Sequence, residues 1–497
     1  MSEQILKPNV ELPLAASYNT RGQYAGTSLY TDGVDQRKIN SIYRLVRNAM
    51  TGRTTLYLAK RPGVADQGSS FGTTGQVAYL VVVPGTPSAL DSSPWVFSVS
   101  TNDVRASSSS TTTTIFTEAG YMPTFVDKTA ISGTDTIVMQ ARKATGEQRI
   151  WYASAIASWT EITDGDFTAL TLKGKMEFID GYALIMDSRS RIYNSDINSL
   201  SSWGAANFIT KQIQQDIPVG LARFNQQIIA FGEKTMEVFQ NAGNPSGSPL
   251  SSVPSLFKEY GMFTLLNVSG KTHYYQVLGE HLYFVGRGGD TEYEAAVFAY
   301  NGQTVEKVST PFIDSILATT THYSVNVVGY SGYNAIAISL DLTTATTQRW
   351  LMFFPEWNEW FEWNSTVFTP VNNGTYFLGV GSSQHKVYYV GGAAADNWQD
   401  AGSNFTVTHQ FMIPPDGNHR KFMPMFSLVG DTARAASNVA VSFSDDDWQT
   451  FSTARNIDMT SDTKALFRCG SFRKRGVKMT HTANTDLRLE KVAMRVE

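Results

Sequence analysis

The residue types that perform enzymatic chemistry occur in this sequence, but not at the spacings that such chemistry requires. The seven histidines are scattered, and none has the HExxH or HxH spacing of a metal site. The single cysteine, Cys469, excludes an intrachain disulfide and is expected to be a small core residue. There is no phosphate-binding glycine loop, and a paired acid and base can be recognised only in space. We therefore expect no catalytic residue, no metal ion and no cofactor, and predict that the protein is not an enzyme.

Three consecutive aspartates form the densest group of carboxylates. Residues 444–451 read Ser-Asp-Asp-Asp-Trp-Gln-Thr-Phe and are similar to the Asp-box turn Ser-x-Asp-x-Gly-x-Thr-Trp, with Asp447 at the glycine position. In that turn the aspartate binds backbone amides and the aromatic ring packs beneath, so its role is structural. A calcium site is the alternative, but consecutive acids lack the alternate-residue spacing of a wrapping loop. We favour the structural interpretation.

An aromatic run at residues 353–363, Phe-Phe-Pro-Glu-Trp-Asn-Glu-Trp-Phe-Glu-Trp, could bind sugars or bases through exposed rings. A hairpin with a Pro-Glu-Trp-Asn turn would also place these rings opposite one another as packing pairs. We favour packing over binding.

Basic residues gather near the end of the chain. They alternate with apolar residues, which indicates strands with one charged face, so a protein interface or a solvated face is favoured over contacts with nucleic acid. These basic residues are Arg468, Arg473, Lys474, Arg475, Lys478, Arg488, Lys491 and Arg495.

An unbroken Ser/Thr tract cannot bury apolar surface and is expected to be a mobile, exposed loop. The tract consists of Ser107, Ser108, Ser109, Ser110, Thr111, Thr112, Thr113 and Thr114.

The elements that would position these residues follow one recurring pattern: a polar turn, four to seven apolar residues, then another turn. Three units are especially alike, at residues 178–194, 222–239 and 277–300, and each reads as strand, tight turn, strand, turn, strand. This is the inner part of a four-stranded blade at the spacing of a β-propeller. Helical periodicity is nearly absent, apart from one short helix expected at residues 311–317. We predict an all-β fold with a propeller-like core of six or seven blades.

Length and composition set the domain organisation. A chain of 497 residues predicts several domains, and its 42% hydrophobic, 12% aromatic and 17% charged residues are typical of an ordered β protein. We expect an N-terminal arm and part of a platform at 1–75, a β-propeller core with loop insertions at 76–400, and a C-terminal β-sandwich platform at 401–497. The apolar runs are too short for a membrane span, and residues 1–8 lack the apolar stretch of a signal peptide, so we expect a soluble protein that is cytosolic when made.

Several stretches resemble the tail-nozzle proteins of short-tailed phages (podoviruses), also called packaged-DNA stabilisation or tail tubular proteins. The similar stretches are residues 35–40, 51–63, 222–243 and 468–478. They occur in the same order as in that family, whereas the insertion around 86–120 has no clear counterpart. The resemblance spans most of the chain, in separate segments.

This resemblance implies a structural protein of the virion tail with a propeller core and a platform made from the chain ends. It implies a homohexameric ring below the portal and the head-tail adaptor, which retains packaged double-stranded DNA, forms the channel for DNA ejection without sequence recognition, and carries tail fibres or tailspikes. Candidate contacts with the upstream ring are Arg61, Arg468, Arg473, Lys474, Arg475 and Lys478. The net charge of -4 agrees with a conduit, because a lumen lined with Lys and Arg would hold phosphates.

Two other functions remain open at this point. A propeller glycosidase would use the Asp-box-like turn and the aromatic run, although no repeated set of Asp boxes occurs. A carbohydrate-binding propeller on a tail is the third interpretation.

Overall fold

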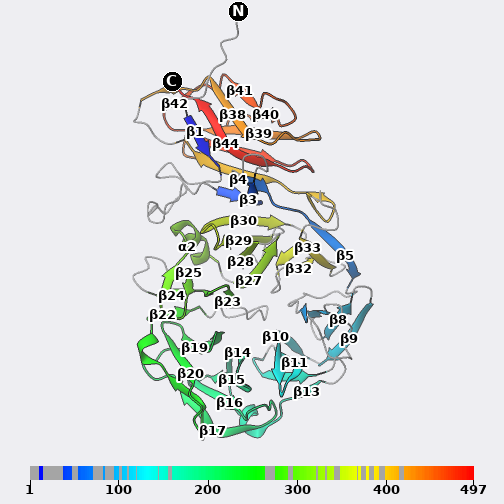
Figure 1. The fold of residues 1–497 in the computed structure, drawn as a ribbon, viewed down its shortest axis with the longest axis vertical. Coiled ribbons are helices and arrows are strands. Elements are labelled where there is room, and N and C mark those ends of the chain that lie inside the picture. Colours follow the sequence, from blue (N-terminus) through cyan, green and yellow to red (C-terminus); the bar gives the residue numbers. More distant parts are fainter. Residues whose placement is uncertain are drawn as a thin grey trace, which may run out of the picture.

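The computed structural model shows an elongated molecule in which a ring of small β-sheets lies below a β-sandwich (Figure 1). Both chain ends contribute to the sandwich, and the middle of the chain forms the ring. The structure describes residues 10–14, 37–47, 54–70, 82–83, 95–99, 103–108, 111–118, 120–143, 145–154, 159–263, 275–288, 295–320, 323–330, 333–340, 348–365, 368–370, 376–379, 386–390, 398–413 and 419–497.

The ring is a β-propeller, and seven of its sheets lie within the described residues. This confirms the predicted fold, with the larger of the two predicted blade numbers. The first three blades in the chain consist of β6 (Val82–Val83), β7 (Trp95–Val99), β8 (Asp103–Ser108) and β9 (Thr111–Thr117); β10 (Tyr121–Ile131), β11 (Thr134–Lys143), β12 (Gln148–Ala153) and β13 (Thr160–Glu161); and β14 (Leu172–Ile179), β15 (Tyr182–Asp187), β16 (Arg191–Ser195) and β17 (Trp203–Thr210).

The next three blades follow the same up-and-down order. In one of them β22 and β23 pair with different halves of β24, so together they take the place of one strand. These blades consist of β18 (Pro218–Phe224), β19 (Gln227–Gly232), β20 (Met236–Asn241) and β21 (Leu250–Ser252); β22 (Tyr260–Met262), β23 (Tyr275–Leu278), β24 (His281–Gly288), β25 (Ala296–Tyr300) and β26 (Val305–Lys307); and β27 (Tyr323–Tyr330), β28 (Tyr333–Leu340), β29 (Gln348–Phe354) and β30 (Glu359–Ser365).

The seventh blade closes the ring with strands from both ends of the propeller sequence. Strand β5 (Val64–Ser70) precedes the first blade and pairs antiparallel with β33 (Lys386–Val390), Val64 lying opposite Val390. This pairing fastens the last blade to the segment that precedes the first blade and so closes the ring. The remaining strands of this sheet are β31 (Phe368–Pro370), β32 (Tyr376–Gly379), β34 (Gln399–Asp400) and β35 (Ser403–Asn404).

The blades form because their strands are apolar on both faces and are joined by tight turns. In β15 every residue after Tyr182 is buried, as expected for a strand covered by a sheet on each side. Leu184 and Ile192 of one blade pack with Leu221 and Ile228 of the next. The turn between β14 and β15 uses Asp180 and Gly181, both with positive φ, which is the geometry of a two-residue hairpin turn.

The sandwich consists of two sheets with one apolar core between them. One sheet contains β1 (Val10–Pro13), β3 (Ser41–Arg47), β4 (Thr54–Lys60), β38 (Met425–Gly430), β41 (Ala465–Phe467) and β44 (Arg488–Arg495). The other contains β2 (Arg37–Ile39), β36 (Val407–Met412), β39 (Asn438–Ser444), β40 (Arg455–Asp458) and β43 (Gly476–His481). A two-stranded ladder of β37 (Lys421–Phe422) and β42 (Ser471–Phe472) lies at the end far from the propeller.

The second sandwich sheet continues directly into a propeller blade. Ile39 of β2 pairs in parallel with Glu362 of β30, so strands β27 to β30 and the sandwich strands form one nine-stranded sheet. The indole of Trp363 donates to the carbonyl of Ser41 at 3.0 Å. The two parts of the molecule are therefore joined by a continuous backbone ladder.

Helices are short throughout the described part of the chain. They are α1 (Gly165–Thr168), the 3-10 helix η1 (Pro254–Leu256) and α2 (Pro311–Ala318). Thr310 caps the N-terminus of helix α2, and Pro311 occupies its first position, which confirms the short helix expected at 311–317. No described helix is long and apolar enough to cross a membrane.

The Ser/Thr tract differs from its prediction as a loop. Ser107 and Ser108 end β8, and Thr111 to Thr114 begin β9, with Ser107 opposite Thr112. Hydroxyl-bearing β-branched threonines suit a strand, and pairing along the hairpin outweighs the absence of apolar side chains. Ser109 and Ser110 lie outside the described residues.

Candidate functional site at the sandwich and its junction with the propeller

Arg61 lies in the junction between the sandwich and the propeller, where the chain passes from β4 to β5. Its side chain is 0% exposed and forms a two-bond ion pair with Asp400, at 2.9 Å and 2.6 Å. The guanidinium also donates to Asn40 Oδ1 at 3.0 Å and lies 3.9 Å from the centre of the Phe405 ring. Arg61 is therefore unavailable to another chain, and its prediction as an interface residue is wrong: in one copy it holds the junction together.

Two more buried charge groups surround this junction. Lys38 pairs with Glu359 at 3.2 Å, and both charges are nearly inaccessible to solvent. Burial opposes ionisation of Glu362, but Arg349 and Arg37 outweigh it and lower the pKa of that carboxyl. Because every one of these acids has a basic partner, the junction holds its charges through specific pairs.

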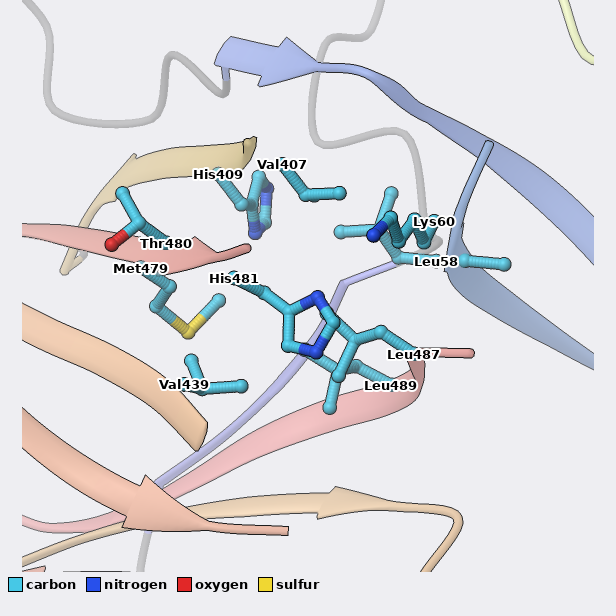
Figure 2. Close-up of a pocket in the computed structure, with 11 residues that line it drawn as sticks. Leu58, Lys60, Val407, His409, Val439, Met479, Thr480, His481, Leu487 and Leu489 are labelled. Carbon is cyan, nitrogen blue, oxygen red and sulfur yellow. The ribbon is translucent and has the colours of Figure 1, made fainter. Parts of the chain in front are cut away.

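A small cavity between the two sandwich sheets contains two histidines and a lysine (Figure 2). Burial and the nearby charge of Lys38 lower the pKa of His409 to about 3, and burial and Lys60 lower the pKa of His481 to about 4. The Nε2 of His481 lies 2.9 Å from the hydroxyl of Ser437. The cavity has a volume of about 10 Å³, which is at the lower limit for one water molecule and too small for an organic ligand.

The basic C-terminal segment separates into paired and unpaired residues. Arg475 is 4% exposed and forms two bonds of 2.7 Å to Asp445, while its guanidinium lies 4.4 Å from the centre of the Phe472 ring. Lys474 pairs with Asp447, and Lys478 lies over the Phe451 ring. The interface prediction is wrong for Arg475, because burial takes it out of reach of a partner. Arg468 and Arg473 are exposed.

The Asp-box-like turn has the structural geometry that the sequence suggested. Asp446 accepts hydrogen bonds from the hydroxyl and the backbone N–H of Thr450, and these bonds lower the pKa of its carboxyl to about 2. With Ser444 first and Thr450 seventh, the glycine position of the turn is occupied by Trp448 and not by Asp447; Trp448 has φ of +71° and Asp447 before it has φ of +57°, which explains why a glycine is usual here. The Trp448 ring lies so close to Gly476 that a Cβ there would meet it at 2.8 Å.

The aromatic run packs as a hairpin. Phe353 lies opposite Trp360 across β29 and β30, with ring centres 5.0 Å apart, and Trp350 lies opposite Trp363. Both Trp350 and Trp363 are 1% exposed. These indoles contribute to the core and are not a platform for a ligand.

The sequence did not point to a buried polar group near the centre of the propeller. Lys175 and Glu177 of β14 form an ion pair of 3.0 Å, and the hydroxyl of Tyr275 in β23 donates to Glu177. The Lys175 ammonium also lies over the rings of Phe125 in β10, at 4.7 Å, and of Tyr275, at 4.4 Å. These strands lie toward the middle of the ring in Figure 1, so side chains of three blades meet there. The signal in the sequence that could have revealed this group is the presence of charged residues, Lys175 and Glu177, inside the otherwise apolar end of strand β14.

Within the described ranges, no group of three or more His, Cys, Asp or Glu side chains could hold a metal ion. The sequence also missed four exposed side chains at the far end of the sandwich: Arg420, Phe422, Arg455 and Phe467. Alternation along 421–427 places Phe422 on an outer face, which was a usable signal for that residue. The exposure of the other three side chains depends on how strands β40, β41 and β42 pack together, which the sequence does not show.

Residues 113–334 match the family described as "Bacteriophage P22 Gp10, beta-propeller". The match includes the four complete blades from β10 to β26. It confirms the resemblance to tail-nozzle proteins that the sequence motifs suggested. A comparison with curated proteins found no match.

Three solved structures show a low similarity to this chain. A computationally designed protein, Ika8, is 9% identical, with a TM-score of 0.35 over 64% of this chain and 98% of its own. A chain of the mitotic checkpoint complex is 11% identical, with a TM-score of 0.37 over 67% of this chain and 95% of its own. An exo-beta-1,3-galactanase from Phanerochaete chrysosporium is 10% identical, with a TM-score of 0.28 over 92% of this chain and 100% of its own. These similarities are too weak to carry an argument.

The family match and the propeller geometry therefore agree: over residues 113–334 the chain is similar to the phage tail-stabilisation family of P22 Gp10, which identifies it as a structural component of the virion tail.

Proposed function

We propose that this chain is the subunit of a tail-nozzle ring, built from six copies, below the portal and head-tail adaptor of a short-tailed phage. The ring retains packaged double-stranded DNA, conducts it during ejection without reading its sequence, and carries tail fibres or tailspikes. The family match supports the tail role.

Contacts near the centre of the propeller support a channel between copies. Lys175 contacts Phe125 and Tyr275, so side chains of three blades meet where a double helix would have to pass within one chain. A conduit for DNA then needs several copies around a common axis, which requires head-to-tail interfaces that close into a ring.

The sandwich end is the proposed contact with the upstream ring. Of the candidate residues, Arg468, Arg473, Lys474 and Lys478 keep some exposure, whereas Arg61 and Arg475 do not. Their basic side chains would steer and orient an adaptor of opposite charge.

The decisive experiment is a phage that lacks this protein. We expect such particles to package DNA and then to lose it, so that nuclease-protected DNA per head falls over hours while the number of heads stays constant. Heads that keep their genomes but fail to adsorb to cells would contradict the conduit and favour receptor binding.

A glycosidase or a carbohydrate-binding propeller remains the alternative. The two features that favoured it have structural roles here, because Trp350 and Trp363 are buried and Asp446 binds its own turn. Incubation of the purified chain with host polysaccharide, followed by measurement of reducing ends and of retained polymer, separates cleavage from binding.

A further inference from the structure

An exposed group of arginine and phenylalanine side chains lies at the end of the sandwich farthest from the propeller, around β37, β41 and β42 (Figure 1). Phe422 and Phe467 are 46% and 48% exposed, although both belong to strands. Strand pairing connects them: Phe422 lies opposite Ser471, and Phe467 lies opposite Met425. We call this the arginine–phenylalanine surface; its members are Arg420, Phe422, Arg455, Phe467, Arg468 and Arg473.

The backbone beneath this surface is fixed. Arg455 donates to the carbonyl oxygens of Phe467 at 2.7 Å and Arg468 at 3.4 Å, which satisfies the outer edge of β41. Arg420 donates to the Ser471 hydroxyl at 3.0 Å and 2.8 Å. A surface that is ordered before binding loses less entropy when a partner docks.

The arginines here lack acidic partners, unlike most of the basic residues in the C-terminal segment. In the part of the chain that the structure describes, Arg420, Arg455, Arg468 and Arg473 form no ion pair with a carboxylate. Five other basic residues of the segment do form such pairs: Lys474 with Asp447, Arg475 with Asp445, Arg488 with Asp431, Lys491 with Glu11, and Arg495 with Glu497. Acidic partners are therefore available along the sandwich, whereas four arginines without one gather at this surface.

Charge is also unequally divided along the molecule. Residues 76–400 contain 18 Lys and Arg against 29 Asp and Glu, whereas 1–75 and 401–497 together contain 22 against 15. The propeller part is thus acidic and the chain ends that build the sandwich are basic, a difference that the overall charge of -4 conceals.

We propose that the arginine–phenylalanine surface docks an acidic protein surface of another tail component, with Phe422 and Phe467 buried at the centre and the arginines paired to carboxylates around them. Arginine and aromatic residues at the centre of an interface contribute most of its binding energy. The proposal rests on the tail role proposed above.

The same observations argue against other occupants. Copies in a ring point the same way, so sandwich would meet sandwich, and two basic ends would repel each other. Contacts with DNA phosphates would use the arginines but would leave two phenylalanines exposed, since duplex DNA is bound mainly through its charged backbone.

Photo-crosslinking in assembled particles tests the occupant. Benzoylphenylalanine replaces Phe467 in one phage and Leu45 in a second; Leu45 is 52% exposed on β3 of the same sandwich and serves as the control. We expect a product from position 467 that contains a different, acidic protein chain, and no such product from position 45. Crosslinks to DNA, to a second copy of this chain, or to nothing would overturn the proposal.

A binding experiment with the purified full chain tests the chemistry. The probes are a random glutamate–tyrosine copolymer, polyglutamate and a 30-base-pair duplex, measured in about 0.15 M salt, where exposed charges are screened beyond about 8 Å. We expect the copolymer to bind more tightly than polyglutamate or the duplex.

Two pairs of substitutions should each weaken binding of the copolymer about tenfold or more: Phe422→Ser with Phe467→Ser, and Arg468→Gln with Arg473→Gln. The matched control, Arg434→Gln with Lys464→Gln, removes the same charge elsewhere on the sandwich and should leave binding unchanged. Tightest binding to the duplex, or equal loss in the control, would refute the proposal. The DNA-retention experiment stays independent, because a ring could hold DNA whatever docks on this surface.

Discussion

At the scale of single residues, the charges at the junction are the side chains on which the fold most depends. Arg61 is fully buried and forms an ion pair with Asp400, so removal of the carboxylate would leave an uncompensated buried cation. We expect Asp400→Asn to lower the free energy of unfolding by roughly 3–5 kcal/mol in urea titrations. Glu11→Gln, which breaks the exposed pair with Lys491, should cost less than about 1 kcal/mol. Equal losses in the two variants would show that the junction does not depend on this pair.

The buried histidines of the sandwich give stability a pH dependence. The ordinary pKa of histidine is 6.5, and in the folded chain the pKa of His481 is lowered to about 4. The unfolded chain therefore binds more protons between these values, so this contribution is present above pH 6.5 and is lost as the pH falls toward 4. A shift of this size corresponds to roughly 3 kcal/mol. In urea titrations at several pH values, the difference in stability between the native chain and His481→Gln should shrink as the pH falls from 7 to 4; a constant difference would contradict this account.

At the scale of elements, the close approach of neighbouring blades can be tested at one glycine. Gly174 of β14 has φ of +68°, and a Cβ there would meet the Cα of Gly220 in β18 at 2.5 Å. Gly133 has a similar φ of +76° but nothing within 4 Å, so Gly133→Ala measures the backbone strain alone, about 1–2 kcal/mol. Gly174→Ala should cost a further 1–3 kcal/mol or more, because two blades must move apart. Similar melting temperatures for the two variants would show that the blades tolerate separation here.

At the scale of the whole molecule, the unequal distribution of charge between the acidic propeller and the basic sandwich should determine how weakly the chain binds DNA. An acidic propeller repels phosphates, so the full chain should bind a 30-base-pair duplex no more tightly than a Kd of about 10⁻⁵ M in 0.15 M salt, within the usual range for non-specific binding. Fluorescence anisotropy over a range of salt concentrations measures this. Nanomolar binding with a steep salt dependence would indicate a surface that holds DNA and would conflict with a conduit.

The repeating blades could be predicted from the amino-acid sequence because each blade is local: a two-residue turn such as Asp180-Gly181 and the apolar strands on either side of it lie within a few residues of one another. The short helix at 311–317 could be predicted for the same reason, and the motifs pointed to the tail-nozzle family. The roles of the charged residues, in contrast, follow from the tertiary structure. Arg61 and Asp400 lie 339 positions apart in the sequence, so no local pattern could relate them. Whether an arginine faces a partner protein or an aspartate of its own chain depends on packing between strands from the two ends of the chain. The strand that closes the ring, β5, and the exposure of Phe422 beside Ser471 follow from the same long-range pairings.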